Sequence, residues 1–338
     1  MISMRSQQPE VRNQRSVTAF CLLFSVFCLT LTLAAPFDSL SLAQGRQMPR
    51  TWTPPLTTWG DPDLTGRWPL THLNGTPVQR PAEFGERRLL TDQEFAKREA
   101  DIAANRIRLA GAWAEVGEAN RLTSLVVDPP NGRLPSLTDQ GRTRAATMTS
   151  SWSDMLFTSV NDFNALDRCM TRGMPASMFP FMYNSGIEIL QAPGYVVIRF
   201  ELIHETRVIP LDGRPRPAPA IRFWLGEPRG RWEGRTLVVE TTNFNGRTPM
   251  MIVGPGGGGI PTSERLRVVE RFTRVDENTI DYEMTVEDPV VLTRPWKAAF
   301  PLKRDPSYYL FEYACHEGNQ AISNALRNSR YLERQPAR

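Results

Sequence analysis

The chain has 338 residues, with 40 Lys and Arg against 36 Asp and Glu and a formal net charge of +4. Hydrophobic residues make up 41% and charged residues 22%, which is the composition of an ordinary globular protein and excludes a largely disordered or fibrous chain. Because the net charge is small and no run of Lys or Arg stands apart from acidic neighbours, the sequence argues against a nucleic-acid partner.

The first 43 residues have the order of a secretory signal peptide. Three arginines precede an apolar run over about 17–35, and Ser41-Leu42-Ala43 supplies small residues at a cleavage position. We therefore predict a signal peptide at 1–43, cleaved near Ala43, and a periplasmic or secreted mature chain without a transmembrane span. An uncleaved N-terminal anchor is the alternative.

Removal of the signal peptide would also change the cysteine count. Cys21 and Cys28 would leave with it, so that only Cys169 and Cys315 remain. In an oxidising compartment such a pair is a candidate disulfide, and two free buried thiols are the alternative.

Residues 44–150 are predicted to form a Pro-rich arm and a helix that pack on the main body. The arm covers about 44–90 and is rich in Pro, Thr and Gly, which favour extended, irregular structure. The run Thr91-Asp92-Gln93-Glu94 has the pattern of a capping box, and apolar residues repeat every seven positions behind it. The pattern predicts one amphipathic helix over about 92–111.

Residues 151–338 are predicted to form a β-barrel-like domain. Segments rich in Val, Ile, Phe, Tyr and Thr alternate with turn residues. The expected strands are 187–190, 195–209, 222–225, 236–243, 264–274, 279–288, 291–302 and 308–315. The links between them are short, which favours an antiparallel meander, and about eight strands suggest closure into a barrel or a strongly curled sheet. The predicted fold is therefore mainly β, with one N-terminal helix and a Pro-rich arm.

Three ionisable residues interrupt apolar strand faces. Alternation along 195–209 places His204 on the apolar face and Arg207 on the opposite one. Glu270 lies on the apolar face of 264–274, and Asp288 ends the inward series of 279–288. Buried ionisable groups need partners and are often kept at functional sites, so these three are the candidate catalytic residues. Each is equally well explained as a core polar group with its hydrogen bonds satisfied.

The same alternation separates two of the candidates. If Arg274 pairs with Ile280 across the turn, Glu270 faces Met284, and Asp288 lies about four residues further along. The two carboxylates would then mark different depths of the interior. A metal site built from His204, His316 and a carboxylate lacks any short ligand spacing, so neither a metal nor a cofactor is predicted.

Several stretches resemble a bacterial family of exported proteins of unassigned function. The most specific is Gly-Arg-Trp-Glu-Gly-Arg-Thr-Leu-Val-Val-Glu-Thr-Thr-Asn-Phe-Asn at 230–245, and others lie at 125–135, 168–169, 189–194, 207–214, 264–271 and 287–296. The match departs from the family at Arg235, where Asp is usual. The resemblance implies export, a Pro-rich arm and a β-rich body, and it brings no catalytic assignment. The strand meander is similar to lipocalin barrels by fold-level analogy alone.

Three functions are compatible with these patterns. The first is an exported barrel that binds a small apolar or amphipathic molecule in an apolar interior, lined by Phe200, Trp224, Tyr282, Met284 and Trp296. The second is an enzyme, such as a hydrolase, dehydratase or isomerase, with His204 as acid/base and Glu270 or Asp288 as its partner. The third is a structural or interaction protein whose inward polar groups satisfy one another. A filled interior would argue against the first two.

Overall fold

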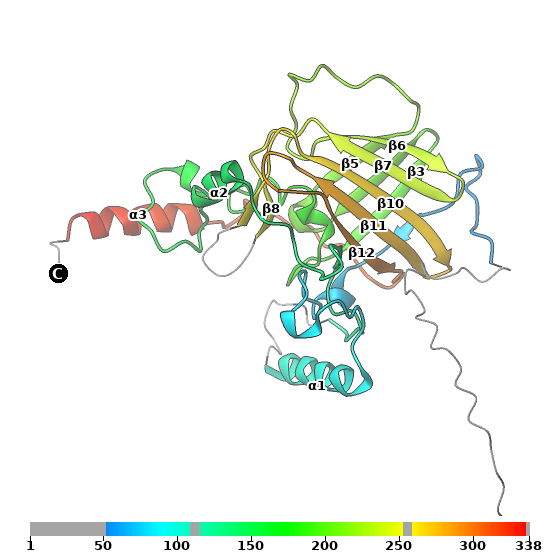
Figure 1. The fold of residues 1–338 in the computed structure, drawn as a ribbon. Coiled ribbons are helices and arrows are strands. Elements are labelled where there is room, and N and C mark those ends of the chain that lie inside the picture. The colour runs from blue at the N-terminus through cyan, green and yellow to red at the C-terminus, as the bar shows by residue number, and fades with distance from the viewer. Residues whose placement is uncertain (1–51, 109–114, 116, 253–258, 336–338) are drawn as a thin grey trace, which may run out of the picture. The chain divides into compact units, whose positions relative to one another are not determined.

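The computed structural model describes residues 52–335, apart from 109–114, 116 and 253–258 (Figure 1). These residues belong to one compact unit that covers 48–338. The predicted signal peptide lies outside the described residues, and its export function stays a prediction. Within the described part of the chain, no helix combines the length and the apolar character that crossing a membrane requires.

The unit is mainly β, as predicted, and its described residues form three sheets. A six-stranded sheet has the order β2-β12-β11-β10-β7-β6, a four-stranded sheet has the order β1-β3-β4-β5, and β8 pairs with β9. The strands are β1 Gly66–Arg67, β2 Val126–Asp128, β3 Ile187–Ala192, β4 Tyr195–Phe200, β5 Thr206–Pro210, β6 Glu227–Glu233, β7 Thr236–Thr242, β8 Pro249–Ile252, β9 Gly259–Pro261, β10 Arg267–Asp276, β11 Thr279–Glu287 and β12 Trp296–Lys303.

Among the described residues, three α-helices accompany the sheets: α1 Asp92–Arg108, α2 Asp139–Ala146 and α3 Ala321–Glu333. The predicted start of α1 is confirmed, because Thr91 N–H donates to Glu94 Oε2 at 2.8 Å and Glu94 N–H donates to Thr91 Oγ1 at 3.3 Å. The predicted end of this helix, at 109–111, lies outside the described residues. The short 3-10 helices are Thr71–Leu73, Ala82–Phe84, Val160–Asp162, Ala176–Met178 and Leu202–His204.

The predicted barrel is wrong, because the sheets are open and none is strongly curled. Hairpin pairing follows the chain within β3-β4-β5 and within β10-β11-β12, as a meander requires. The chain then leaves the first sheet at the end of β5 and begins the second at β6, and the two strands are not neighbours in a common ladder. The predicted strand 222–225 contributes only a bridge between Phe223 and Phe244, and 308–315 is not a strand.

One hydrophobic core lies between the inner faces of the two larger sheets. Alternate residues of β4 and of β10, β11 and β12 are buried in it, which matches the period-two pattern of those segments. The predicted disulfide is confirmed: Cys169 is bonded to Cys315, 146 residues away. This bond fixes the segment that follows β12 to the loop before β3.

Candidate functional site

Glu270 is fully buried between the sheets, as its strand pattern predicted, and it is paired there. Arg207 Nη1 donates to Glu270 Oε1 at 3.0 Å, and Nη2 is bonded to Oε2. The Tyr282 hydroxyl donates to the same Oε1 at 2.9 Å. Arg207 comes from β5 of one sheet, whereas Glu270 and Tyr282 come from β10 and β11 of the other. The cluster therefore ties the two sheets face to face.

The charges of this cluster are mutually compensated. Burial by itself would lower the pKa of Arg207, but the attraction of Glu270 outweighs it and the pKa is raised above its usual value. Burial, assisted by the nearby carboxylate, raises the pKa of Tyr282, so its hydroxyl stays protonated and serves as a donor. The side chains of Arg207 and Glu270 are 1% and 0% exposed, so neither group is available to a substrate from solvent.

The placement of His204 on an apolar face is wrong, because the segment 195–209 is not one strand. It is a hairpin of β4 and β5, and the 3-10 turn Leu202–His204 connects the two strands. Ile203 and His204 both have positive φ, at 58° and 44°. The turn shifts the alternation, so Arg207 faces the core and His204 is exposed, with Nδ1 2.9 Å from the carbonyl oxygen of Tyr313.

Asp288 is buried, and its carboxylate is saturated by local hydrogen bonds. Its two oxygens accept from Ser263 N–H at 2.7 Å, Ser263 Oγ at 2.6 Å and Val290 N–H at 3.2 Å. Among the described contacts, His204, Glu270 and Asp288 share no partner. Glu270 pairs with Met284 across β10 and β11, as predicted. The structure thus does not assemble the three candidates into a catalytic group.

The side chains predicted to line an interior pocket instead fill the core. Phe200, Tyr282, Met284 and Trp296 are all members of the main buried cluster. The Tyr282 ring lies 4.8 Å from the ring of Phe272 and 5.2 Å from that of Phe300, which is close aromatic packing. Trp224 is half-buried in the loop between β5 and β6. A cavity that Phe200 helps to line measures about 10 Å³, room for one water at most.

Another buried carboxylate, that of Glu201, anchors the β4–β5 turn. Glu201 accepts from Asn184 Nδ2 at 2.9 Å, from Gly186 N–H at 3.2 Å and from Phe311 N–H at 3.2 Å. The Tyr308 hydroxyl adds a fourth bond at 2.6 Å, and burial raises the pKa of this tyrosine, which keeps it a donor. With four donors around it, Glu201 positions the turn and the segment after β12 rather than offering a free base.

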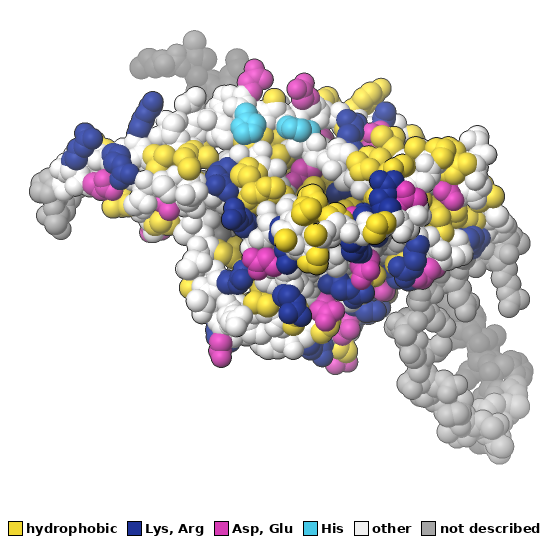
Figure 2. All heavy atoms as spheres, turned by 90° about the horizontal axis from the view of Figure 1, so that it is seen from above, with side chains coloured by type: hydrophobic (Ala, Val, Ile, Leu, Met, Phe, Trp, Pro, Cys, Tyr) yellow, Lys and Arg dark blue, Asp and Glu magenta, His cyan; other side chains and the backbone are white. Residues whose placement is uncertain are grey.

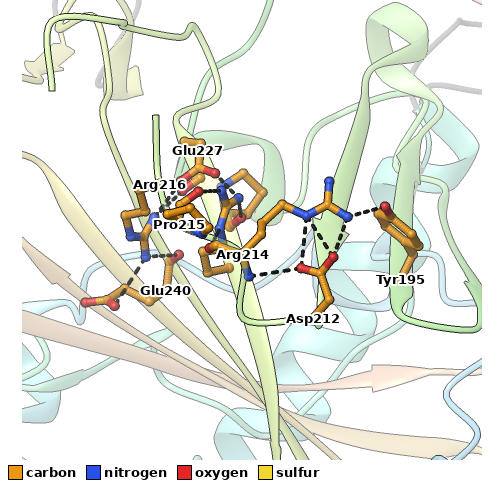
Figure 3. Close-up of polar contacts among 9 residues, drawn as sticks. Tyr195, Asp212, Arg214, Pro215, Arg216, Glu227 and Glu240 are labelled. Carbon is orange, nitrogen blue, oxygen red and sulfur yellow. Dashed lines mark hydrogen bonds and ion pairs between the residues drawn. The ribbon is translucent and has the colours of Figure 1, made fainter. Parts of the chain in front are cut away.

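The loop between β5 and β6 is held by arginine–carboxylate pairs (Figure 3). Arg214 Nε lies 2.9 and 2.8 Å from the two oxygens of Asp212, and this hydrogen bonding lowers the pKa of Asp212 to about 2. Arg216 donates to Glu227 Oε2 at 2.8 Å and to Glu240 Oε2 at 3.3 Å. Residues of the stretches 207–214 and 230–245, which carry the resemblance described above, form part of this network. The arginines and carboxylates of the network neutralise one another.

An external groove of about 220 Å³ lies where β1, β3 and the segment after β12 meet. Its lining residues are Thr65, Gly66, Arg67, Glu188, Ile189, Leu190, Arg304 and Pro306. Leu190, which is 43% exposed, and Pro306 give it apolar surface. The groove therefore combines apolar and charged walls at the surface of the unit.

The two arginines of the groove differ in their partners. Arg67 Nη1 donates to the carbonyl oxygens of Tyr308 at 2.8 Å and Pro306 at 3.2 Å, and its guanidinium lies 5.3 Å from the centre of the Tyr309 ring. Glu188 is balanced by Arg199, at 2.8 Å, and by Arg67, at 3.7 Å. Within the described part of the chain, the half-buried Arg304 side chain has no hydrogen bond or ion pair.

Gly66 makes room for this unpaired guanidinium. A Cβ at position 66 would lie 3.3 Å from Arg304 Nε and 3.2 Å from Trp68 Nε1, both closer than most real Cβ contacts. The φ of Gly66 is +152°, which side-chain-bearing residues rarely adopt. Sequence reasoning missed this site, because its residues come from three distant segments and follow no short motif.

Comparison with protein-family models, with curated proteins and with solved structures finds no match to this chain. Among the described residues, no three or more His, Cys, Asp and Glu side chains are grouped so that they could hold a metal ion.

Proposed function

We propose that this chain is an exported protein that binds a small amphipathic molecule with an anionic group, in the groove between β1, β3 and residues 304–306. Export and membership of the family of exported bacterial proteins rest on the signal-peptide pattern and on the motif at 230–245. The external position of the site follows from the packed interior, where the residues first expected to line a pocket contact one another.

The observation that carries the proposal is the unpaired guanidinium of the half-buried residue Arg304 in a groove with an apolar wall. A partly desolvated cation without a counter-ion gains more from a charge-assisted hydrogen bond than a fully hydrated one does. Ligand sites commonly combine apolar surface with a few polar anchors, and Leu190 and Pro306 supply the apolar surface here. A ligand whose carboxylate bonds to Arg304 and whose apolar part lies along Leu190 would supply the missing counter-ion and cover the apolar surface.

The experiment is a calorimetric titration of the mature, disulfide-bonded protein with hexanoate and benzoate, and with hexanol and benzyl alcohol as neutral counterparts. We expect the acids to bind and the alcohols to bind at least about tenfold more weakly, because a hydrogen bond to a charged group contributes roughly 1.5–3 kcal/mol. Arg304→Gln should weaken binding of the acids by about 10- to 100-fold.

The matched control is Arg294→Gln, an exposed arginine outside the groove whose side chain lies 3.5 Å from Asp128. It should leave acid binding unchanged. Equal binding of acids and alcohols, or equal loss in both variants, would show that Arg304 is not the anchor. Failure of every acid to bind at millimolar concentration would remove the proposal for this ligand class.

A further inference from the structure

A second surface, separate from the groove, lies on α3 and the loop that packs on it. Arg327, Arg330, Tyr331 and Arg334 occur at i, i+3, i+4 and i+7, which places them on one side of the helix and its C-cap. Together with Leu326 they line an open depression of about 410 Å³. Residues 321–335 contain three arginines against one glutamate, so this surface is basic.

The positive charge of this surface is largely uncompensated. Arg330 is paired with Glu333, at 2.8 and 3.0 Å, and donates to the Thr158 carbonyl oxygen at 2.8 Å. In the described part of the chain, Arg327 and Arg334 have no ion pair. The part of the unit that contains α3 in Figure 1 shows dark-blue side chains in Figure 2, beside hydrophobic ones and a smaller number of acidic ones.

Large apolar side chains lie exposed on the loop that contacts α3. Phe157 N–H donates to Ser329 Oγ at 2.8 Å, which fixes the loop against the helix. The neighbouring exposed side chains, together with two on the helix, are Trp152, Met155, Leu156, Val160, Tyr331 and Leu332. Trp152 is 72% exposed and Tyr331 is 62% exposed. Large exposed apolar patches are typical of surfaces that bind a protein or a membrane.

We infer that α3 and residues 152–160 form a docking surface for an anionic lipid bilayer. Arginines on one side of an amphipathic helix attract acidic headgroups, while exposed Trp, Tyr and aliphatic side chains enter the boundary between headgroups and acyl chains. The complementarity of charge favours an anionic surface, and the mixture of indole, phenol and aliphatic groups favours lipid over an acidic protein. Asp154 is the one acidic residue in 151–160 and does not outweigh the arginines.

The test is co-sedimentation of the mature, disulfide-bonded protein with vesicles. Vesicles of phosphatidylcholine that contain one third phosphatidylglycerol should bind the protein, and pure phosphatidylcholine should not. Binding should weaken as salt rises, because exposed charges are screened. The double variant R327Q/R334Q should bind about 30-fold more weakly, since each arginine contributes about one kcal/mol near an anionic surface. W152S should also weaken binding, at unchanged salt dependence.

The control is R222Q/R294Q, which removes two exposed arginines in the β5–β6 and β11–β12 loops, and it should bind like the unaltered protein. All of these positions are exposed, so circular dichroism melting should show that every variant folds. Equal binding to charged and uncharged vesicles, or binding of R327Q/R334Q as tight as that of the unaltered protein, would overturn the inference. Retention on polyglutamate without any vesicle binding would assign the surface to an acidic protein partner instead.

Discussion

The buried pair Arg207–Glu270 gives the most quantitative prediction. Arg207→Met keeps an unbranched apolar side chain but removes both bonds to Glu270 and the bond of Nη2 to Thr241 Oγ1 at 3.3 Å. Glu270 then remains fully buried with Tyr282 as its one side-chain donor. Breaking a buried ion pair by removing one partner typically costs about 3–5 kcal/mol. Since domains are stable by about 5–15 kcal/mol, this is a large share of the total.

Urea unfolding of the disulfide-bonded protein measures this loss. With a slope of about 2.5 kcal/mol per molar urea, Arg207→Met should lower the midpoint by roughly 1–2 M. Glu270→Leu should cost a similar amount, because it leaves the guanidinium buried and unpaired. The double variant should be less destabilised than the sum of the two, by at least about 1 kcal/mol. A loss below about 1 kcal/mol for Arg207→Met, or strictly additive losses, would refute the coupling between the sheets.

The buried Asp288, the disulfide and the half-buried His72 give three further predictions. Asp288→Ala should lower the free energy of unfolding in urea by about 2–4 kcal/mol, because three donors lose a charged acceptor. A loss under about 0.5 kcal/mol would show that the carboxylate of Asp288 does not stabilise the fold. Replacing Cys169 and Cys315 by Ser should destabilise by about 2–5 kcal/mol, since the bond closes a loop of 146 residues, and an unchanged midpoint would contradict this. Burial lowers the pKa of His72, whose Nε2 lies 2.9 Å from the Pro301 carbonyl oxygen. In the unfolded chain His72 has its usual pKa of about 6.5, so it takes up a proton at a higher pH than it does in the folded protein. Stability should therefore fall as pH drops from 7 to 5. His72→Gln should reduce that fall, and parallel pH curves for the two proteins would disprove it.

The strand pattern predicted the buried face correctly in β10 and β11. Alternation in β10 and β11 placed Glu270 and Asp288 inside, and the register Glu270–Met284 followed from the turn alone. The capping box predicted the start of α1 and the cysteine count predicted the disulfide. These successes share a cause: each depends on residues close in sequence or on an elimination that needs no geometry.

The errors began at the β4–β5 turn. Glu201-Leu202-Ile203-His204-Glu205 contains no Gly, Pro or Asn, so nothing local marked it as a turn. Its positive φ values are held by distant groups, since Tyr308 and Phe311 bond to Glu201 from the segment after β12. Because this turn is absent from the strand pattern, the pattern assigns residues within and after it to the wrong faces: His204 to the inside and Arg207 to the outside.

Closure of the sheet was equally beyond local patterns. The residues of β4, β10 and β11 alternate in an open sandwich as they would in a barrel, because both bury one face of each strand. Which strands become edges depends on long-range pairing, such as β12 with β2, whose residues lie more than 150 positions apart. One feature of the sequence is related to the packing of the two sheets: Arg207 and Glu270 are opposite charges on strands of different hairpins, and they pair across the core.

The buried pair also decides where a ligand can bind. To open the space between the sheets, a ligand would have to separate Arg207 from Glu270 or displace the rings around Tyr282. A cost of about 3–5 kcal/mol for the charges alone corresponds to a loss of roughly two to three and a half orders of magnitude in affinity. A ligand beside Arg304 incurs no such loss, because that guanidinium has no partner to give up among the described residues and lies in a groove already open to solvent. The same residue type therefore holds the fold together in the core and, in the function proposed above, recognises the ligand at the edge of the sheet.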